Sequence, residues 1–253
     1  MAEALLMAAP SPAIVVVDDS AALAEAATAR VMARIADNPG RIAICLTGGS
    51  SPKQLYELLG QQPFAGRIPW PRVHWFIGDD RFVPPGDSLH NMSKTRAIFL
   101  DRCAPAANIH PINTSAGSPA EAATSYEREL QLFNGAQDLD PAHPLFDVVL
   151  MGVGSDGHVA SLFPTYPAIE VTDHWVVGVP EAHVAPFVPR VSLTLPALGS
   201  CREMLFLLGG PDKRAILSRL MSGEDLPANR ARARAGETVF LCDRSAMPDR
   251  DDG

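Results

Sequence analysis

The sequence predicts an α/β protein with a mostly parallel sheet flanked by helices. Short runs rich in valine, isoleucine and leucine alternate along the chain with longer amphipathic segments, as in folds whose parallel strands are joined by helices. Several apolar runs end abruptly in glycine or polar residues, and such folds bind ligands at the carboxyl ends of their strands. The chain has no internal repeat and no Gly/Ser linker. We therefore expect one domain over residues 1–253, with a loose polar tail from about residue 244.

The N-terminal half begins with a β-branched run and an alanine-rich helical segment. Asp18, Asp19 and Ser20 offer N-cap side chains for that helix, and an Asn-Pro-Gly stretch stops it. Pro52 fits the first turn of the next helix. The predicted elements of this half are a strand at 13–17, a helix at 21–36, a strand at 41–46, a helix at 53–60, a strand at 73–77 and helices at 91–100 and 119–133.

The C-terminal half continues the alternation after a loop rich in proline and aspartate. A buried strand there ends in the glycine-rich stretch that carries His158, and a helix or turn follows that stretch. A later apolar run ends in Gly-Gly-Pro-Asp and leads directly into a helix. The predicted elements are strands at 147–151, near 175–179, near 190–195 and at 204–208, a helix at 213–221 and a short strand at 238–241.

Composition and charge exclude several classes of protein. The net charge of −8 and the absence of a long run of like charges argue against nucleic-acid binding. No apolar stretch approaches membrane-spanning length, and the first residues lack the features of a signal peptide, so we expect a cytoplasmic protein that does not bind membranes. The four cysteines (Cys45, Cys103, Cys201 and Cys242) are widely spaced without a C-x-x-C pair. This spacing favours buried free thiols over disulfides or metal ligands.

The loop TGGSSP after the second predicted strand has the composition of a phosphate-binding loop. Gly48 and Gly49 let the backbone approach a ligand, Ser50 adds a hydroxyl donor, and free N–H groups at the start of the next helix suit an anion. An ordinary capped turn is the alternative, and the loop lacks Walker A spacing. The stretch GVGSDG has the spacing of a dinucleotide fingerprint, but Asp156 and His158 occupy the place that a pyrophosphate needs.

Two further loops each carry a cation at the end of a predicted strand. In GDDRFVPP, Arg81 is able to clamp a phosphate or carboxylate with two hydrogen bonds; the alternative is a local Asp–Arg pair that only holds the loop. In GGPDKR, Lys213 projects from the first turn of a helix, where the alternative is a solvated lysine. Because these loops follow strands of one parallel sheet, we expect them to converge at the same edge.

His158 is the strong candidate for a general base or acid. A neutral histidine takes a proton from water readily near pH 7, and Asp156, two residues earlier, is placed to orient its ring. The alternative is a structural histidine, which is the more common role of a single histidine in a loop. The other six histidines form no H-E-x-x-H or similar metal-binding spacing, and no G-x-S-x-G elbow of a serine hydrolase occurs.

Several motifs, in this order along the chain, resemble the 6-phosphogluconolactonase family. They are GDDRFVPP with Asn91 downstream, GVGSDGHVASLFP, PRVSLTLPAL and GGPDKRAIL, and TGGSSP is similar to that family's phosphate loop. Together they extend from about residue 41 to 222. The resemblance implies a modified Rossmann-like fold shared with glucosamine-6-phosphate deaminases and ribose-5-phosphate isomerases. It also implies that no metal and no organic cofactor is required.

The resemblance further implies roles for individual residues. His158 matches the family's water-activating histidine and Asp156 the acidic position beside it, so these two are the candidate catalytic residues. The candidate substrate-binding residues, which match positions around the phosphate or the sugar, are Gly48, Gly49, Ser50, Arg81, Asn91, Arg190 and Lys213. Two positions depart from the family pattern: Asp80 stands where a glutamate is usual, and His90 stands where a serine is usual. The first departure leaves the role of Asp80 open, and the second removes a serine contact.

The function implied by the resemblance is hydrolysis of 6-phospho-D-glucono-1,5-lactone to 6-phospho-D-gluconate in the oxidative pentose phosphate pathway. The implied partner is this small sugar-phosphate lactone, and we expect a monomer. We expect His158 to activate the attacking water, and backbone N–H groups of residues 154–158 to stabilise the oxyanion.

Two other functions remain open at this point. A glucosamine-6-phosphate deaminase needs a further carboxylate beside the histidine, but where the deaminase pattern has Asn-Glu-Pro this chain has Leu162-Phe163-Pro164. A non-catalytic sugar-phosphate sensor keeps the pocket without the chemistry. Such sensors usually carry a DNA-binding or partner domain, for which this chain has no room.

Overall fold

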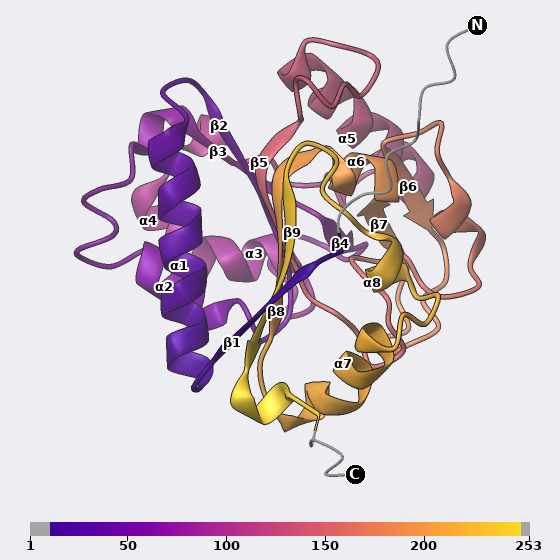
Figure 1. The fold of residues 1–253 in the computed structure, drawn as a ribbon. Coiled ribbons are helices and arrows are strands. Elements are labelled where there is room, and N and C mark those ends of the chain that lie inside the picture. The colour runs from indigo at the N-terminus through magenta and orange to yellow at the C-terminus, as the bar shows by residue number, and fades with distance from the viewer. Residues whose placement is uncertain (1–10, 249–253) are drawn as a thin grey trace, which may run out of the picture.

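A six-stranded parallel sheet forms the centre of the computed structural model, which describes residues 11–248 (Figure 1). The order across the sheet is β1-β9-β8-β5-β2-β3. The central strands β2 and β5 are buried along their whole length because the sheet is covered on both faces. The prediction of a mostly parallel sheet flanked by helices is confirmed. The strands are β1 (Ala13–Val17), β2 (Ile42–Leu46), β3 (Val73–Ile77), β5 (Phe146–Met151), β8 (Cys201–Leu208) and β9 (Glu237–Asp243).

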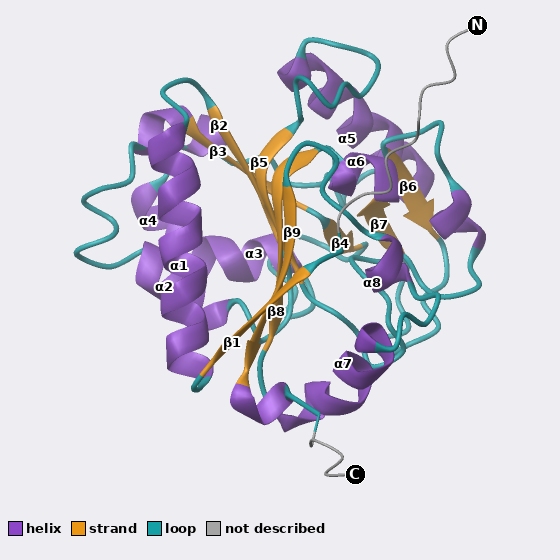
Figure 2. Cartoon of the chain, in the orientation of Figure 1, coloured by secondary structure: helices purple, strands orange, loops and turns teal. Residues whose placement is uncertain are grey.

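Helices lie on both sides of this sheet (Figure 2). The longest, α1, begins as predicted, because the Asp19 side chain accepts a hydrogen bond from Ala22 N at 2.9 Å. On its side of the sheet lie α1 (Ser20–Asp37), α2 (Lys53–Leu59), α3 (Asn91–Thr95), the π-helical turn Arg96–Leu100 and α4 (Asp101–Cys103). On the other side lie α5 (Pro119–Asn134), α6 (Leu195–Gly199), α7 (Arg214–Met221) and α8 (Pro227–Arg230).

Three short strands form a second, antiparallel sheet beside the first. They are β4 (Asp79–Arg81), β7 (Arg190–Leu193) and β6 (Val176–Val179), in the order β4-β7-β6. The chain enters this sheet directly from β3 through Gly78. The strand predicted near 190–195 is too long, because Thr194 caps α6: its hydroxyl accepts from Ala197 N at 3.5 Å, and Pro196 lies in the first turn.

The strand order places a topological switch point between β2 and β5. From β2 the chain runs outward to β3, then crosses back to β5 on the other side of β2. The loops that leave the carboxyl ends of these two strands therefore diverge and open a crevice. Those loops are TGGSSP and GVGSDGH, the two glycine-rich stretches that the sequence singled out.

The C-terminal segment is anchored for some residues beyond the last strand. Arg244–Ala246 form a short 3-10 turn capped by Asp243, and Ala246 is buried, so the predicted loose tail does not begin at 244. Residues 249–253 lie outside the described range. All four cysteines are free, as predicted, although Cys103 is only partly buried.

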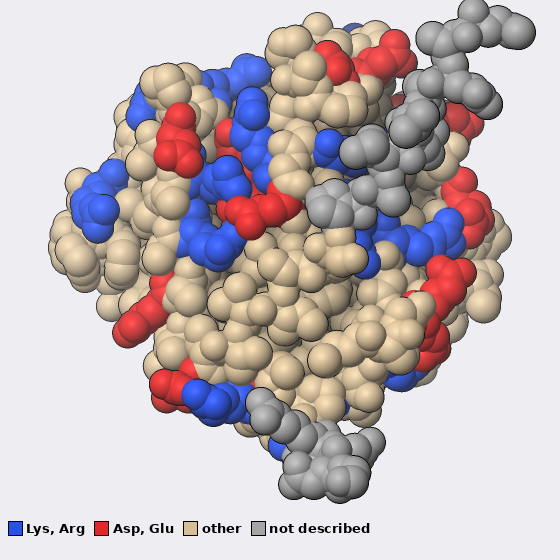
Figure 3. Space-filling view, in the orientation of Figure 1, with Lys and Arg blue, Asp and Glu red and all other residues tan. Residues whose placement is uncertain are grey.

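Charged side chains on the face shown in Figure 3 lie in mixed groups. Arg30 and Arg34 on α1 pair with Glu203 and Glu237 on the neighbouring strands. Within residues 11–248, no helix has the length and apolar character needed to span a membrane.

Candidate active site

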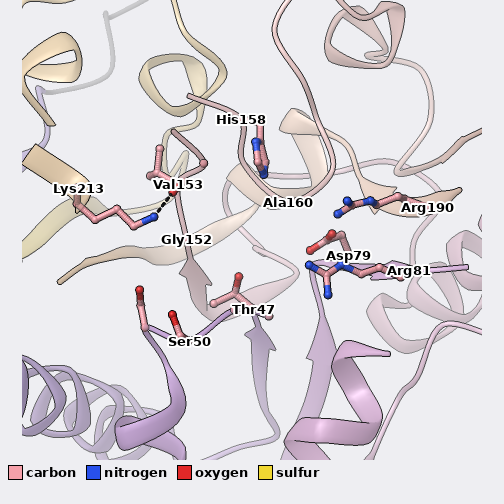
Figure 4. A pocket seen from close by; sticks show the side chains of 14 residues that line it. Thr47, Ser50, Asp79, Arg81, Gly152, Val153, His158, Ala160, Arg190 and Lys213 are labelled. Atoms are coloured by element: carbon pink, nitrogen blue, oxygen red, sulfur yellow. Dashed lines mark hydrogen bonds between the residues drawn. The ribbon is translucent and has the colours of Figure 1, made fainter. Parts of the chain in front are cut away.

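A pocket of about 180 Å³ lies at the carboxyl edge of the main sheet, at the switch point. Its walls come from the loops after β2 and β5, from β4 and β7 of the small sheet, and from the turn before α7 (Figure 4). The predicted convergence of the loops is confirmed. The predicted site residues that line this pocket are Gly48, Gly49, Ser50, Arg81, His158, Arg190 and Lys213. Asp156 and Asn91 lie behind the pocket wall, each in contact with a residue that lines it.

The glycine loop after β2 needs its glycines for two different reasons. A Cβ atom at Gly48 would collide with the side-chain amide of Asn91, and Gly49 has a φ of +93°, which L side chains rarely adopt. Tyr56 anchors the start of the loop, since its hydroxyl bonds both N and O of Thr47, at 3.0 and 2.8 Å. In the part of the chain that the structure describes, the N–H groups of Gly48, Gly49 and Ser50 meet no protein acceptor. They remain available to an anion.

Two arginines face each other on the opposite side of the pocket. Arg81 on β4 and Arg190 on β7 are direct cross-strand partners, and both point into the pocket with Asp79 between them (Figure 4). Like charges placed opposite each other destabilise a strand pair. Burial lowers the pKa of Arg190, whose side chain is almost fully enclosed. The Asp79 carboxylate already accepts a hydrogen bond from Ser161 Oγ at 2.6 Å, and its single negative charge does not balance two guanidinium groups. This wall of the pocket therefore favours an anionic ligand.

Hydrogen bonds hold the two arginines in place from behind. Arg81 Nη1 donates to Leu89 O and to Asn91 Oδ1, both at 2.9 Å, and Arg190 Nη2 donates to Pro186 O at 2.9 Å. The Nε atoms of both arginines are buried and have no acceptor among residues 11–248. Asn91, which the sequence predicts as a substrate contact, is thus placed to orient Arg81 and to pack under the glycine loop.

The two departures from the family pattern have structural roles here. Asp80 is fully buried and accepts hydrogen bonds from the backbone N–H groups of Arg81, Asn91 and Met92, so it fixes the start of α3. Burial raises the pKa of Asp80 to about 7, against those hydrogen bonds. His90 caps the same helix by accepting from Ser93 N at 3.1 Å.

The histidine predicted as the base forms a close pair with its aspartate. His158 Nδ1 donates to Asp156 Oδ1 at 2.6 Å, and His158 N donates to the same oxygen at 3.1 Å. With Nδ1 occupied, Nε2 is the nitrogen left to accept a proton from the pocket side. Burial disfavours the charge on Asp156, but the hydrogen bonds and charge of His158 outweigh it, so the pKa of this carboxyl is lowered. Gly154 is required because a Cβ there would collide with the imidazole ring.

Lys213 reaches the pocket from the turn before α7. Its Nζ donates to Val153 O at 3.0 Å, which draws the amine over the loop after β5. Figure 4 shows Lys213 and Ser50 on one side of the pocket, Arg81 and Arg190 on the other, and His158 between them. The pocket therefore presents a base flanked by positive charge.

The other residues that line the pocket were not among the predicted site residues: Thr47, Ser51, Asp79, Gly152, Val153, Gly154 and Ala160. Asp79 and Arg81 share one face of β4 while Asp80 takes the other, because side chains alternate along a strand, but the sequence did not predict this strand. Ala160 lies in the pocket wall and has a positive φ of 48°, which is uncommon for alanine. No sequence pattern predicts this backbone conformation. Among the described residues, no cluster of His, Cys, Asp and Glu is arranged to hold a metal ion.

The sequence model of the family described as glucosamine-6-phosphate isomerases/6-phosphogluconolactonase matches residues 18–240. The chain belongs to this family. A curated relative from Synechocystis sp., named 6-phosphogluconolactonase, is 36% identical over 225 residues, which cover 87% of this chain and 88% of the relative. The resemblance inferred from the motifs is confirmed.

Solved structures agree with this assignment. A 6-phosphogluconolactonase from Trypanosoma cruzi superimposes with a TM-score of 0.82 at 27% identity, over 94% of this chain and 97% of that one. A monomeric glucosamine-6-phosphate deaminase gives a TM-score of 0.78 at 16% identity, a likeness of fold alone. The predicted relation to the deaminase fold is therefore confirmed.

Proposed function

We propose that the protein is a 6-phosphogluconolactonase, which hydrolyses 6-phospho-D-glucono-1,5-lactone to 6-phospho-D-gluconate in the pentose phosphate pathway. The observation that carries the proposal is the joint presence, in one small pocket, of a histidine–aspartate pair and of cations without enough counter-charge. A lactone bearing a phosphate needs both features. The relatives named 6-phosphogluconolactonase support the same reaction.

The reaction begins with water held at Nε2 of His158. The histidine takes a proton as the water oxygen attacks C1, which gives a tetrahedral intermediate with a negative charge on the former carbonyl oxygen. When the intermediate collapses, the C1–ring oxygen bond breaks, and the imidazolium returns its proton to the leaving oxygen. Asp156 holds the ring in the tautomer that exposes Nε2 and stabilises the imidazolium between these steps.

The substrate phosphate is bound by groups that take no part in proton transfer or bond formation. Free N–H groups of Gly48 to Ser50, together with Arg81 and Lys213, line the cavity that the phosphate would enter, and Arg190 adds a second guanidinium. Anchoring the phosphate fixes the distant lactone carbonyl against His158, so its contribution to rate is orientation. The helix dipole adds little at this loop, because α2 has only seven residues.

Three of the backbone N–H groups of residues 154–158, where oxyanion donors were expected, are already engaged. The N–H groups of Gly154, Gly157 and His158 all donate within the loop, to His158 O, Gly154 O and Asp156 Oδ1. They serve to shape the turn that presents the imidazole. In the described residues, the N–H groups of Ser155, Asp156 and Ala160 meet no protein acceptor, so these three remain candidates for the oxyanion donors.

The segment that follows His158 lacks the side chains that deaminase chemistry requires. Leu162 and Phe163 are fully buried, and Phe163 packs beside the His158 ring with centroids 4.9 Å apart. No carboxylate from this segment reaches the pocket, so the extra acid that a deaminase needs is missing from this position.

The test is hydrolysis of freshly generated 6-phosphogluconolactone, followed by coupling to 6-phosphogluconate dehydrogenase with the spontaneous rate subtracted. His158→Ala should lose most of the acceleration with little change in KM. His143→Ala is the matched control, since His143 also pairs with an aspartate at 2.9 Å but on the exposed surface. No acceleration by folded wild-type protein, or full activity in His158→Ala, would reject the proposal.

A further inference from the structure

A second histidine faces the carboxylate that holds His158. Asp156 gives Oδ1 to His158, whereas its Oδ2 is buried and has no hydrogen-bond partner within residues 11–248. Nε2 of His183, on the loop between β6 and β7, lies 3.7 Å from Oδ2. That distance is an ion-pair contact, too long for a hydrogen bond. The two imidazoles thus approach opposite oxygens of one carboxylate.

Aromatic packing keeps His183 beside this carboxylate. Its ring stacks on Phe163 with centroids 5.5 Å apart and planes 23° from parallel, and the Tyr166 ring meets it edge-on at 5.1 Å. Phe163 is fully buried and also contacts His158, so it is a fixed platform between the two histidines.

We propose that His183 is a positioning residue that shares the carboxylate of Asp156 with His158 and so limits how strongly Asp156 holds the protonated form of His158. One carboxylate balances one imidazolium well but two poorly. Attraction between His183 and Oδ2 draws negative charge away from the His158 side. The protonated form of His158 is then less strongly stabilised, which favours the neutral imidazole that the proposed reaction uses as a base. The catalytic consequence rests on the proposed function, but the contact itself does not.

One other charged group faces Asp156. Arg219 on α7 donates to Ser155 O at 3.4 Å, and its charge contributes to the field at Asp156. It is paired with Glu224 through two hydrogen bonds of 2.8 and 2.6 Å, which offset most of that charge. Within residues 11–248, the basic side chains with a nitrogen within 4.0 Å of an Asp156 carboxylate oxygen are His158 and His183.

The experiment follows the histidine ring signals by NMR in substrate-free protein from about pH 5 to 9. His183→Phe keeps an aromatic ring on Phe163 and removes the nitrogen, so the His158 signals should titrate about half a unit higher than in wild type. In the lactonase assay, kcat/KM at pH 6 relative to pH 8 should then fall about threefold, with KM unchanged. The amide of His183→Gln also donates toward Oδ2. In this variant the His158 signals should therefore titrate between those of wild type and those of His183→Phe. His143→Phe is the surface control and should change neither quantity.

Four outcomes overturn the proposal. His158 signals that titrate alike in wild type and His183→Phe remove the coupling, and an equal shift in His143→Phe makes the effect non-specific. A shift produced by Arg219→Gln but absent in His183→Phe assigns the role to the arginine. If Asp156→Asn leaves the His183 signals unmoved, His183 does not interact with the Asp156 carboxylate, and the proposal that the two histidines share it is rejected. These NMR outcomes stand whether or not the protein hydrolyses the lactone.

Discussion

Asp156→Asn tests the link between the carboxylate and His158, the proposed catalytic histidine, with the smallest change of shape. The substitution keeps the volume but replaces the acceptor of the 2.6 Å bond from His158 Nδ1 with an amide. An amide that presents its NH₂ group there would favour the wrong tautomer, with the proton on Nε2, and it would no longer stabilise the imidazolium. KM should change little because Asp156 does not line the pocket.

The size of the effect follows from the geometry. A short hydrogen bond between charged partners contributes about 1.5–3 kcal/mol, and the pair is only about three-quarters enclosed, with side chains 21% and 24% exposed. Losing about 1.5–3 kcal/mol of transition-state stabilisation lowers kcat roughly 13- to 160-fold. Steady-state kinetics with the coupled assay measures this directly.

The matched control is Asp140→Asn, which breaks the corresponding bond to His143 Nδ1 at 2.9 Å on the exposed surface. It should leave kcat within twofold of wild type. An Asp156→Asn enzyme within threefold of wild type would refute the argument that the carboxylate sets the tautomer. A fall in kcat accompanied by an equal rise in KM would instead indicate that the loop has moved.

The other predictions concern the pocket walls and the buried acid. Gly48→Ala places a methyl group against the Asn91 amide, so it should displace Asn91 from Arg81 and raise KM about tenfold in steady-state kinetics; an unchanged KM contradicts this. Arg190→Gln relieves the repulsion between facing arginines, so it should raise Tm in phosphate-free buffer and reduce the Tm gain that inorganic phosphate gives wild type. Because burial raises the pKa of Asp80 to about 7, folding favours its protonated form. The stability from this group is fully present below about pH 4 and is lost as pH rises through about 7, at up to about 1.4 kcal/mol per pH unit. Urea unfolding between about pH 4.5 and 7.5 should show this decline in wild type and lose it in Asp80→Asn.

The sequence was most informative where a single element carries its own pattern. The apolar runs that became β2 and β5 have both the composition and the abrupt polar ends of buried parallel strands, so their positions were predictable to within a residue. The small sheet was not predictable in the same way. β4 consists of Asp79–Arg81, three charged residues with no apolar pattern, and only its pairing with β7, more than a hundred residues away, makes it a strand.

The site divides along the same line. Convergence of the glycine loops followed from the rule that parallel strands place their carboxyl ends at one edge. Whether a residue touches the cavity or supports one that does depends on depth, which the sequence does not record. Asn91 and Asp156 are examples. Each matched a functional motif in the sequence, but in the structure each lies behind the pocket-lining side chain that it orients.

The distance from His158 to Arg81 and Arg190 is set at the seam where the two sheets meet. Gly78 belongs to both: its N–H donates to Leu46 O at 2.9 Å in the main sheet, and its carbonyl accepts from Leu193 N at 2.8 Å in the small one. Ser161 closes the seam from the histidine loop, with its N–H on Ser192 Oγ at 3.1 Å and its hydroxyl on Asp79. The arginines sit on the small sheet and His158 on a loop of the large one, so neither sheet alone fixes their spacing. The buried hydrogen bonds across the seam do, and in the proposed reaction this spacing sets the distance between the bound phosphate and the lactone carbonyl.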